Sequence, residues 1–348
     1  MVVGPFPGGL DSKITFGPLP TSARRQFLAR LDSTAQSTTA TRPWREKADM
    51  IAIMVDLHSP TALDTHNESL AVLAAADARR ALEEDIGPGD LTAALVPAGR
   101  RVRARVVARA SAVVCGAPWA EAALRALDPA AAVDWPVSEG GRCRAGQVIL
   151  VAEADARALL SAERTMLNFL QLLSAVATRT AAYVEAVRGT RARIVDTRKT
   201  LPGLRRAQKY AVRTGGGDNH RMGLHDAVLI KENHIAACGG VAAALRAVHR
   251  QPETRRAAFV QIEVETLAQL EEALAEGATM VLLDNMQRDT LREAVRINAG
   301  RAVLEVSGGV TLDSVRALAE TGVDRISVGA LTKDIEAVDL SMRMETLA

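Results

Sequence analysis

The most restrictive feature of this sequence is a regular alternation of short apolar runs and helical segments between residues 259 and 328. The apolar runs are Phe259–Val264, Met280–Leu283, Ala302–Val306 and Arg325–Val328, and the helical segments between them are Leu267–Ala275, Arg288–Ala299 and Leu312–Glu320. Short apolar strands separated by helices are typical of parallel sheets, whose strands are joined by right-handed crossovers. The pattern therefore predicts a parallel α/β fold for this part of the chain.

Two earlier apolar runs, Ala192–Val195 and Ala227–Ile230, add two strands to the series. The expected number of parallel strands is then six, whereas the common closed α/β barrel has eight. We therefore predict an incomplete parallel α/β barrel of six or seven strands, which occupies residues 168–334.

The sequence ahead of the barrel follows a different pattern. In Arg101–Val114, Val and Ala alternate with Arg, as in a strand with one buried and one solvated basic face. Further short strands and helices predict an N-terminal α+β domain over residues 60–167, with an antiparallel sheet packed on helices. Residues 335–348 are expected to return and cover this domain. A long helical region, Asp155–Val187, is expected to begin with its first residue as N-cap and can break near Glu163.

Composition limits the cellular setting. Residues 1–59 are rich in Pro, Gly, Ser and Thr and are predicted to be a disordered extension. Three widely spaced cysteines form no C-x-x-C pair, which favours free thiols in a reducing compartment over a disulfide framework or a zinc site. No apolar run is long enough for a membrane span, and the N-terminus lacks the pattern of a secretory signal. We therefore expect a cytoplasmic protein that does not bind membranes.

The stretch Asp196–Ile235 holds a local excess of positive charge. The whole chain is nearly neutral, with 43 Lys and Arg against 41 Asp and Glu. The basic residues of the stretch are Arg198, Lys199, Arg205, Arg206, Lys209, Arg213, Arg221 and Lys231, against Asp196, Asp218, Asp226 and Glu232. Such a cluster repels itself unless an anion neutralises it. Because the excess is local, it favours a small anionic ligand over a polyanion such as nucleic acid.

The positions of these charges matter more than their number. Arg198 and Lys199 follow one predicted strand and Lys231 follows the next, and strand ends open onto the active-site face of parallel α/β folds. Three consecutive glycines force a loop that brings His220 and Arg221 back to the same face. Guanidinium groups can hold carboxylates with two parallel hydrogen bonds, and lysines suit phosphates. The sequence therefore predicts a pocket for a small, multiply anionic molecule.

Two carboxylates and two glycine loops are expected beside this pocket. Glu263 and Asp284 lie at the ends of neighbouring strands, which are about 5 Å apart in a sheet, so they can share one small site. Ser307-Gly308 and Gly329 follow the last two strands, where α/β barrels often bind a phosphate with backbone N–H groups. The two loops together predict a site for the 5′-phosphate of a ribose.

Three segments of the basic stretch match a known pattern. DTRKTLPGLR, KYAVRTGGGDNHRMGL and LIKENHI resemble the signature segments of the quinolinate phosphoribosyltransferase family, which is a type II phosphoribosyltransferase family with an incomplete barrel. The resemblance runs from about His66 to the C-terminus, so Met54 is the expected natural start. It implies an enzyme that makes nicotinate mononucleotide, pyrophosphate and carbon dioxide from quinolinate and phosphoribosyl pyrophosphate, with Mg²⁺.

The resemblance also assigns roles to individual residues. The expected substrate-binding residues are Arg164, Thr197, Arg198, Lys199, His220, Arg221, Lys231, Glu263, Asp284, Ser307, Gly308 and Gly329. Lys199, Glu263 and Asp284 are the expected catalytic residues, and both carboxylates are expected to meet Mg²⁺ directly or through water and pyrophosphate. In SAERTMLN, Arg164 matches an arginine that reaches the pocket of a partner subunit, which implies a homodimer or a multiple of dimers. Without the resemblance, Glu163 and Arg164 would be interpreted as surface charges on a helix.

Other functions remain open on the residues alone. A related phosphoribosyltransferase could use another heterocyclic acid, although it would need fewer carboxylate-binding arginines. A barrel aldolase could form a Schiff base through Lys231 or Lys199, which demands a lysine with a lowered pKa. A non-enzymatic anion-binding scaffold would leave Glu263 and Asp284 without a role. A solvated basic face or a nucleic-acid surface is disfavoured, because only Tyr210 in the stretch could stack on bases.

Overall fold

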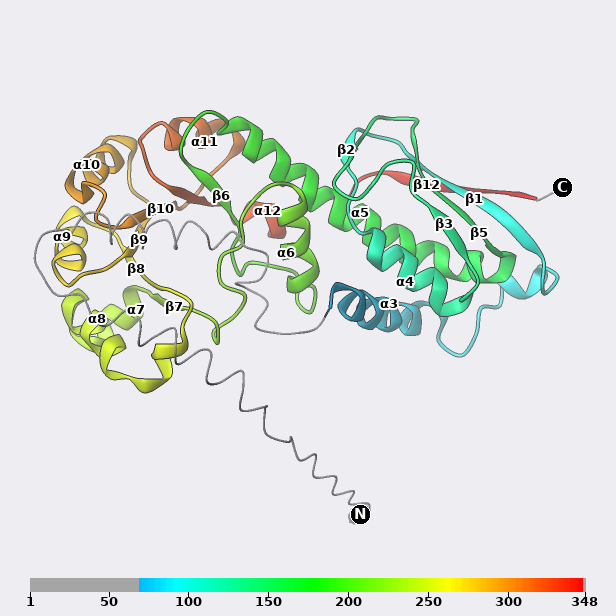
Figure 1. Cartoon of the computed structure of the whole chain (residues 1–348), viewed down its shortest axis with the longest axis horizontal. Coiled ribbons are helices and arrows are strands. Elements are labelled where there is room, and N and C mark those ends of the chain that lie inside the picture. The colour runs from blue at the N-terminus through cyan, green and yellow to red at the C-terminus, as the bar shows by residue number, and fades with distance from the viewer. Residues whose placement is uncertain (1–68, 347–348) are drawn as a thin grey trace, which may run out of the picture. The chain divides into compact units, whose positions relative to one another are not determined.

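The computed structural model describes residues 69–346, which belong to one compact unit spanning residues 65–348. Two main sheets, one parallel and one antiparallel, organise the described residues (Figure 1). The predicted extension, residues 1–59, lies outside the described residues.

The larger sheet has six parallel strands in the order β6-β11-β10-β9-β8-β7. They are β6 (Arg193–Val195), β7 (Val228–Ile230), β8 (Val260–Val264), β9 (Met280–Asp284), β10 (Val303–Ser307) and β11 (Arg325–Ser327). Each lies within one residue of its predicted ends, because each apolar run is bounded by polar or glycine-containing turns. The prediction of an incomplete parallel α/β barrel is confirmed.

Helices cover the outer side of this sheet, as Figure 1 shows for α8, α9, α10 and α11. The helices of the barrel region are α6 (Arg205–Thr214), α7 (Glu232–Cys238), α8 (Val241–Arg250), α9 (Leu267–Ala275), α10 (Arg288–Asn298), α11 (Leu312–Ala319) and α12 (Ala330–Lys333), with a 3-10 turn η3 (Pro252–Arg256). Alternate strand residues such as Ile262 and Leu304 pack in one apolar core with Leu270 and Leu291 of the helices. The positions between them face the other side, where polar residues lie.

The sheet is open between its edge strands β6 and β7, and the chain after α6 runs along the free edge of β6. Asp218 forms a parallel bridge with Val195, and its N–H donates to the carbonyl of Ile194 at 2.8 Å. Three glycines precede it because this segment passes close to helix α5. A Cβ on Gly215 would lie only 2.4 Å from the carbonyl oxygen of Ala177. The glycines therefore permit close packing as well as a turn.

The second sheet is antiparallel, in the order β12-β1-β5-β3. Its strands are β1 (Arg101–Ala108), β3 (Ala132–Asp134), β5 (Val148–Asp155) and β12 (Leu340–Thr346), and a separate pair joins β2 (Ala112–Val113) to β4 (Arg142–Cys143). Helices α3 (Leu70–Ile86) and α4 (Ala117–Leu127) and the 3-10 turn η2 (Ala93–Leu95) belong to the same region. The C-terminal strand pairs with β1, with Met344 opposite Ala104.

Helix α5 (Ala156–Ala186) continues for 31 residues without a break. Asp155 is its N-cap, as predicted, and accepts two backbone N–H groups of the first turn. The break that the sequence allowed near Glu163 is wrong, because Met166 and Leu170 are fully buried and continue the apolar face past that point. The neighbours of α5 include α4 as well as α6 and α11. In residues 69–346, no helix is both long and apolar enough to cross a membrane.

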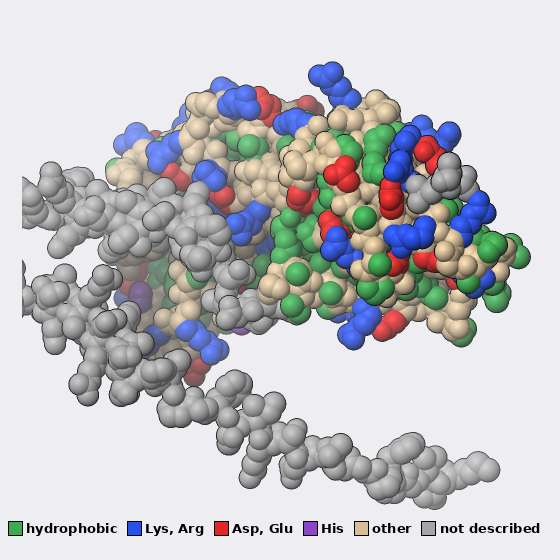
Figure 2. Space-filling view, turned by 45° about the vertical axis from the view of Figure 1, so that its right-hand side comes forward, with side chains coloured by type: hydrophobic (Ala, Val, Ile, Leu, Met, Phe, Trp, Pro, Cys, Tyr) green, Lys and Arg blue, Asp and Glu red, His purple; other side chains and the backbone are tan. Residues whose placement is uncertain are grey.

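The basic stripe on β1 is neutralised within the protein. Arg101 lies 3.1 Å from Asp128, and Arg103 donates to the carboxylate of Glu153 at 2.8 Å. Arg105 pairs with a carboxylate of β12 at 3.1 Å. On the face drawn in Figure 2, Lys and Arg side chains accordingly lie among Asp and Glu side chains. The solvated basic face predicted for this strand is thus a row of exposed ion pairs.

Candidate active site

The predicted site residues gather at one end of the barrel because parallel strands all point the same way. Those that end or follow a strand are Thr197, Arg198 and Lys199 after β6, Lys231 after β7, Glu263 in β8, Asp284 in β9, Ser307 and Gly308 at β10, and Gly329 after β11. His220 and Arg221 come from the segment along the edge of β6. Arg164 is exposed on α5 and takes part in none of the contacts described below.

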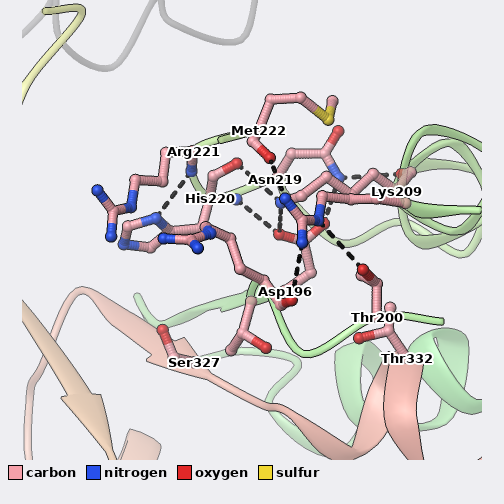
Figure 3. Close-up of polar contacts among 12 residues, drawn as sticks. Asp196, Thr200, Lys209, Asn219, His220, Arg221, Met222, Ser327 and Thr332 are labelled. Carbon is pink, nitrogen blue, oxygen red and sulfur yellow. Dashed lines mark hydrogen bonds and ion pairs between the residues drawn. The ribbon is translucent and has the colours of Figure 1, made fainter. Parts of the chain in front are cut away.

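A buried ion pair joins the two basic segments (Figure 3). Asp196, directly after β6, and Lys209, on α6, are both fully buried, and their side chains pair. Asp196 also accepts the N–H of His220 at 2.8 Å and the side-chain amide of Asn219 at 2.6 Å. Burial raises the pKa of Asp196 and lowers the pKa of Lys209, while their mutual attraction opposes both shifts. The charge of Lys209 is therefore satisfied inside the protein and is not free for a ligand.

Both ring nitrogens of His220 have partners in the protein. Nδ1 accepts the N–H of Arg221 at 2.8 Å, so Nε2 carries the proton of the neutral ring and donates to Oε1 of Gln261 at 2.7 Å. Burial lowers the pKa of His220, against the attraction of Glu305, whose carboxylate lies 3.6 Å from Nε2. In this geometry the neutral ring orients Arg221. Its sequence-based role as a substrate contact stays a prediction.

Arg198 and Arg221 lie near each other, and neither forms an ion pair with a carboxylate of the described residues. Arg221 is 7% exposed, and its Nη1 donates to the carbonyl of Ala227 at 3.2 Å. Burial lowers the pKa of Arg221 and the charge of Arg198 lowers it further, whereas the carboxylate of Asp226 opposes both. Nε of Arg198 is buried and has no hydrogen-bond partner among the described residues. An unsatisfied donor beside a buried cation is the arrangement expected where an anion binds.

The predicted carboxylates lie close together with a lysine. Nζ of Lys231 is 3.1 Å from Oε2 of Glu263. Burial raises the pKa of Glu263, and the charges of Asp284 and Glu232 raise it further, whereas Lys231 lowers it. Glu263 is paired with Leu282, two residues before Asp284, so both carboxylates lie on the same face of the sheet. The strand ends therefore bring the two acids to one place.

These two acids fit the needs of Mg²⁺, which takes one or two protein carboxylates and completes its shell with water and phosphate oxygens. Residues 69–346 contain no cluster of three or more His, Cys, Asp or Glu side chains placed to hold a metal. A metal at Glu263 and Asp284 would therefore need further oxygens from a bound phosphate compound or from water.

Glycines allow close approach at the ends of β10 and β11. A Cβ on Gly329 would lie 3.2 Å from Cδ of Lys199 and 3.8 Å from Oγ1 of Thr197, so these three residues adjoin. Thr197 Oγ1 accepts the N–H of Lys199 at 3.1 Å, which fixes the turn after β6. Gly308 has a φ of +102°, and a Cβ there would lie 2.1 Å from Oδ1 of Asn285. The loop after β10 therefore packs directly on the residue that follows Asp284.

Strands β8, β10 and β11 contain a buried polar layer that the sequence analysis did not predict. Gln261 and Glu305 are fully buried, and Ser327 donates to the carboxylate of Glu305. Arg325 lies 3.1 Å from the same carboxylate, at an angle that makes an ion pair and not a hydrogen bond. Burial raises the pKa of Glu305, but Arg325, His220 and its hydrogen bonds outweigh burial and hold it below its usual value. The sequence signal that could have revealed this layer is the presence of polar residues inside otherwise apolar strands.

A shallow hollow elsewhere on the barrel contains none of the predicted site residues. It lies beside α5 and the beginning of β6, and its lining residues are Val184, Val187, Arg188, Thr190, Ala192, Arg193, Ile194 and Gly216. The converging charges, and not this hollow, mark the site, because its lining includes neither a carboxylate nor a residue after a strand end.

Two neighbouring arginines, two close carboxylates and two glycine loops thus lie together at the carboxyl ends of the strands of an incomplete α/β barrel. This fold and site define a barrel enzyme for small anionic substrates. The chain matches the quinolinate phosphoribosyl transferase N-terminal domain over residues 90–174 and the C-terminal domain over residues 176–343.

Individual relatives agree with these matches. A nicotinate-nucleotide pyrophosphorylase (carboxylating) of Mycobacterium leprae (strain TN) is 47% identical over 275 residues, which cover 76% of this chain and 94% of that protein. A probable nicotinate-nucleotide pyrophosphorylase (carboxylating) of Bacillus subtilis (strain 168) is 40% identical over 263 residues, covering 74% and 89%. The solved structure of the nicotinate-nucleotide pyrophosphorylase from Francisella tularensis is similar with a TM-score of 0.77 and 41% identity, covering 80% of this chain and 98% of that one. The chain belongs to the quinolinate phosphoribosyltransferase family.

Proposed function

We propose that this enzyme transfers the phosphoribosyl group of phosphoribosyl pyrophosphate to the ring nitrogen of quinolinate, and that decarboxylation then gives nicotinate mononucleotide, pyrophosphate and carbon dioxide. The observation that carries the proposal is the neighbouring pair Arg198 and Arg221, in which Nε of Arg198 is buried without a hydrogen-bond partner among the described residues and the charge of Arg198 acts on the buried Arg221. Quinolinate has two adjacent carboxylates, and guanidinium groups match carboxylates in charge and in planar geometry. Membership of the family supports the same reaction.

Binding of the diacid is mainly orientation catalysis. Arg198, Arg221 and Lys231 hold the two carboxylates so that the ring nitrogen, and not an oxygen, faces the sugar. His220 contributes by fixing the backbone N–H of Arg221. Arg164 of a partner subunit completes the diacid pocket.

Transfer requires stabilisation of positive charge on the sugar and negative charge on the leaving group. As the bond to pyrophosphate breaks, the anomeric carbon becomes oxocarbenium-like, and the carboxylates of Glu263 and Asp284 stabilise it. Lys199 stabilises the departing pyrophosphate, beside Gly329. Ser307 and Gly308 hold the 5′-phosphate with backbone N–H groups. Glu263 and Asp284 would also hold Mg²⁺ directly or through water, and the metal, when bound, would supply positive charge that stabilises the leaving group.

Loss of carbon dioxide follows from the chemistry of the alkylated ring. Once the nitrogen is bonded to the sugar, the pyridinium stabilises the carbanion that forms when the adjacent carboxylate leaves. The buried setting of Arg221 favours the loss of the carboxylate, because a site with few waters solvates the carboxylate less. The carbanion then takes up a proton from solvent, which gives the C–H bond of nicotinate mononucleotide.

A Schiff-base mechanism has no support in the site. The lysine whose pKa is lowered by burial is Lys209, which pairs with Asp196. Lys231 pairs with Glu263. The decisive experiment is to mix the purified protein with quinolinate, phosphoribosyl pyrophosphate and Mg²⁺ and to measure nicotinate mononucleotide and carbon dioxide. Absence of both products would overturn the proposal, and borohydride trapping of a substrate on a lysine would favour an aldolase.

The sharing of sites across a dimer can be tested by complementation. Arg164→Ala and Arg198→Ala proteins should each be nearly inactive, because each lacks one diacid contact. Mixed and allowed to exchange subunits, they should recover part of the activity, because a mixed dimer has one intact site. Absence of any recovery in demonstrated mixed dimers would contradict a shared site.

The proposed setting is a reducing compartment, the cytoplasm. Its support is the state of the three cysteines, Cys115, Cys143 and Cys238, which are all free thiols in the structure. Fractionation of cells that make the protein would test this placement.

A further inference from the structure

We propose that the buried pair Asp196 and Lys209 is a positioning device that sets the spacing of Arg198 and Arg221, and with it the affinity for the diacid. This inference rests on the proposed function, because it names a determinant of the diacid half of that site. Neither residue is expected to touch a substrate, since both side chains are fully buried.

The pair holds both backbone polar groups of the residue next to Arg221. Oδ1 of Asp196 accepts the N–H of His220 at 2.8 Å, and Nζ of Lys209 donates to the carbonyl of His220 at 2.9 Å. Asp196 itself lies two residues before Arg198 in the chain. The pair therefore connects the segment that carries Arg198 directly to the segment that carries Arg221. Figure 3 shows Asp196, Lys209 and His220 at this junction.

Asn219 adds two hydrogen bonds to the same junction. Its Nδ2 donates to Oδ2 of Asp196 at 2.6 Å and to the carbonyl of Lys209 at 2.9 Å. Three separate pieces of chain, the end of β6, helix α6 and the segment before Arg221, thus meet at one pair of charges. A shift of any one piece would break hydrogen bonds to buried charged groups, which is costly.

Two physical arguments favour positioning over stability alone. Arg198 and Arg221 repel each other, so without a stiff connection their two segments would separate when no anion is bound. In addition, a buried ion pair contributes little to stability compared with apolar residues of similar size, because the loss of hydration offsets the attraction. A fully buried pair that is joined to both arginine segments is better explained by the geometry that it imposes.

The test is the double variant Asp196→Asn with Lys209→Met, which removes both charges together. Single variants would leave one buried charge without a partner and can fail to fold. Steady-state kinetics of the folded double variant should show a KM for quinolinate raised roughly tenfold or more and a KM for phosphoribosyl pyrophosphate changed by less than about twofold. Hydrogen exchange of the His220 and Arg221 amides should be faster than in the wild-type protein.

The matched control is Asp128→Asn. Asp128 is also a buried carboxylate that accepts two backbone N–H groups and pairs with an arginine, but it lies in the antiparallel region. It should reduce stability without changing the ratio of the two KM values. If the double variant does not fold, Asn219→Ala keeps the pair and removes two of the locking bonds, and should raise the KM for quinolinate about threefold.

A folded double variant with an unchanged KM for quinolinate, or with equal increases for both substrates, would overturn the proposal. So would an Asn219→Ala variant whose KM values both equal those of the wild type. Wild-type protein inactive with quinolinate would instead refute the proposed function. In that case, unchanged amide exchange at His220 in the double variant would still refute the positioning role.

Discussion

The arginines of β1 and the arginines at the end of the barrel differ in what neutralises them. Arg103 and its neighbours on β1 are about half exposed, and each pairs with a carboxylate of the same molecule. Arg221 is buried and is repelled by Arg198, whose Nε is buried without a partner among the described residues, and the carboxylate of Asp226 offsets only part of this charge. The charges of the β1 arginines are neutralised within the fold, whereas the charges of Arg198 and Arg221 are fully neutralised only when an anion binds.

This difference shows how a structure separates charge that maintains the fold from charge that binds a ligand. Exposed ion pairs contribute little to stability but keep the charge of a strand balanced. Buried cations without partners reduce stability and are retained where binding needs them. Substitutions at the barrel arginines should therefore reduce activity much more than substitutions on β1. They should also raise the free energy of unfolding, whereas substitutions on β1 should lower it slightly.

The largest effect is expected for activity. Arg221→Ala should lower kcat/KM for quinolinate by roughly 100- to 1000-fold, because loss of a buried charge contact to the diacid costs several kcal/mol. The KM for phosphoribosyl pyrophosphate should change much less. Arg103→Ala, the matched substitution on β1, should leave both parameters within about twofold of wild type. Steady-state kinetics with each substrate varied in turn measures these values, and equal effects of Arg221→Ala on both substrates would contradict its assigned role.

A smaller effect, and a gain instead of a loss, is expected for the free energy of unfolding of the substrate-free protein. Arg198→Met removes a buried donor that has no partner and relieves repulsion of Arg221. It should raise the free energy of unfolding by about 1 kcal/mol while quinolinate binding is lost. Urea unfolding of the substrate-free proteins measures the difference. A less stable Arg198→Met protein would mean that Arg198 is already satisfied within the fold.

The strands of the barrel could be predicted because their information is local. Each of the six runs, such as Met280–Leu283, combines apolar residues with a flanking turn, and parallel order follows from the helices between them. The continuity of α5 past Glu163 could not be predicted, because it depends on contacts with partners far away in sequence, including α4 and α11.

The site could be predicted only in part. Charges at or just after strand ends, such as Asp284 and Lys231, lie where topology places them. The sequence did not show which cations are already paired: Lys209 belongs to the basic stretch, but its helix turns it inward to Asp196. The polar layer of Gln261 and Glu305 was also missed, because single polar residues within apolar strands become meaningful only when neighbouring strands bring them together.

The two regions should also respond differently to acid. The described residues of the antiparallel region, 69–167, contain no histidine, whereas His220 is buried in the barrel. The groups that face its ring are Glu305 on β10, Arg325 on β11, Gln261 on β8 and Lys209 on α6. Burial, the largest influence, lowers its pKa below the ordinary value of 6.5. Below that pH the unfolded chain binds a proton that the folded chain does not, so stability falls as pH decreases.

His220→Gln should remove this part of the pH dependence. The free energy of unfolding, measured in urea at about pH 7.5 and pH 5.5, should fall less on acidification in the variant than in the wild type. An equal fall in both proteins would show that other groups cause the acid response.

The smallest effect is expected for the ion pair between Arg103 and Glu153 on the antiparallel sheet. Its coupling free energy measures how strongly the arginines of β1 interact with their carboxylate partners. Both Arg103 and Glu153 are partly exposed, so water screens their attraction, and holding two long side chains together costs conformational entropy. A double-mutant cycle with Arg103→Ala, Glu153→Ala and the double variant should give a coupling free energy of about 0.2–1 kcal/mol that decreases as salt is added. A coupling of several kcal/mol would mean that the β1 arginines, like Asp196 and Lys209, are held in place by their partners. The contrast between the two regions would then rest only on the absence of an ion-pair partner at Arg198 and Arg221.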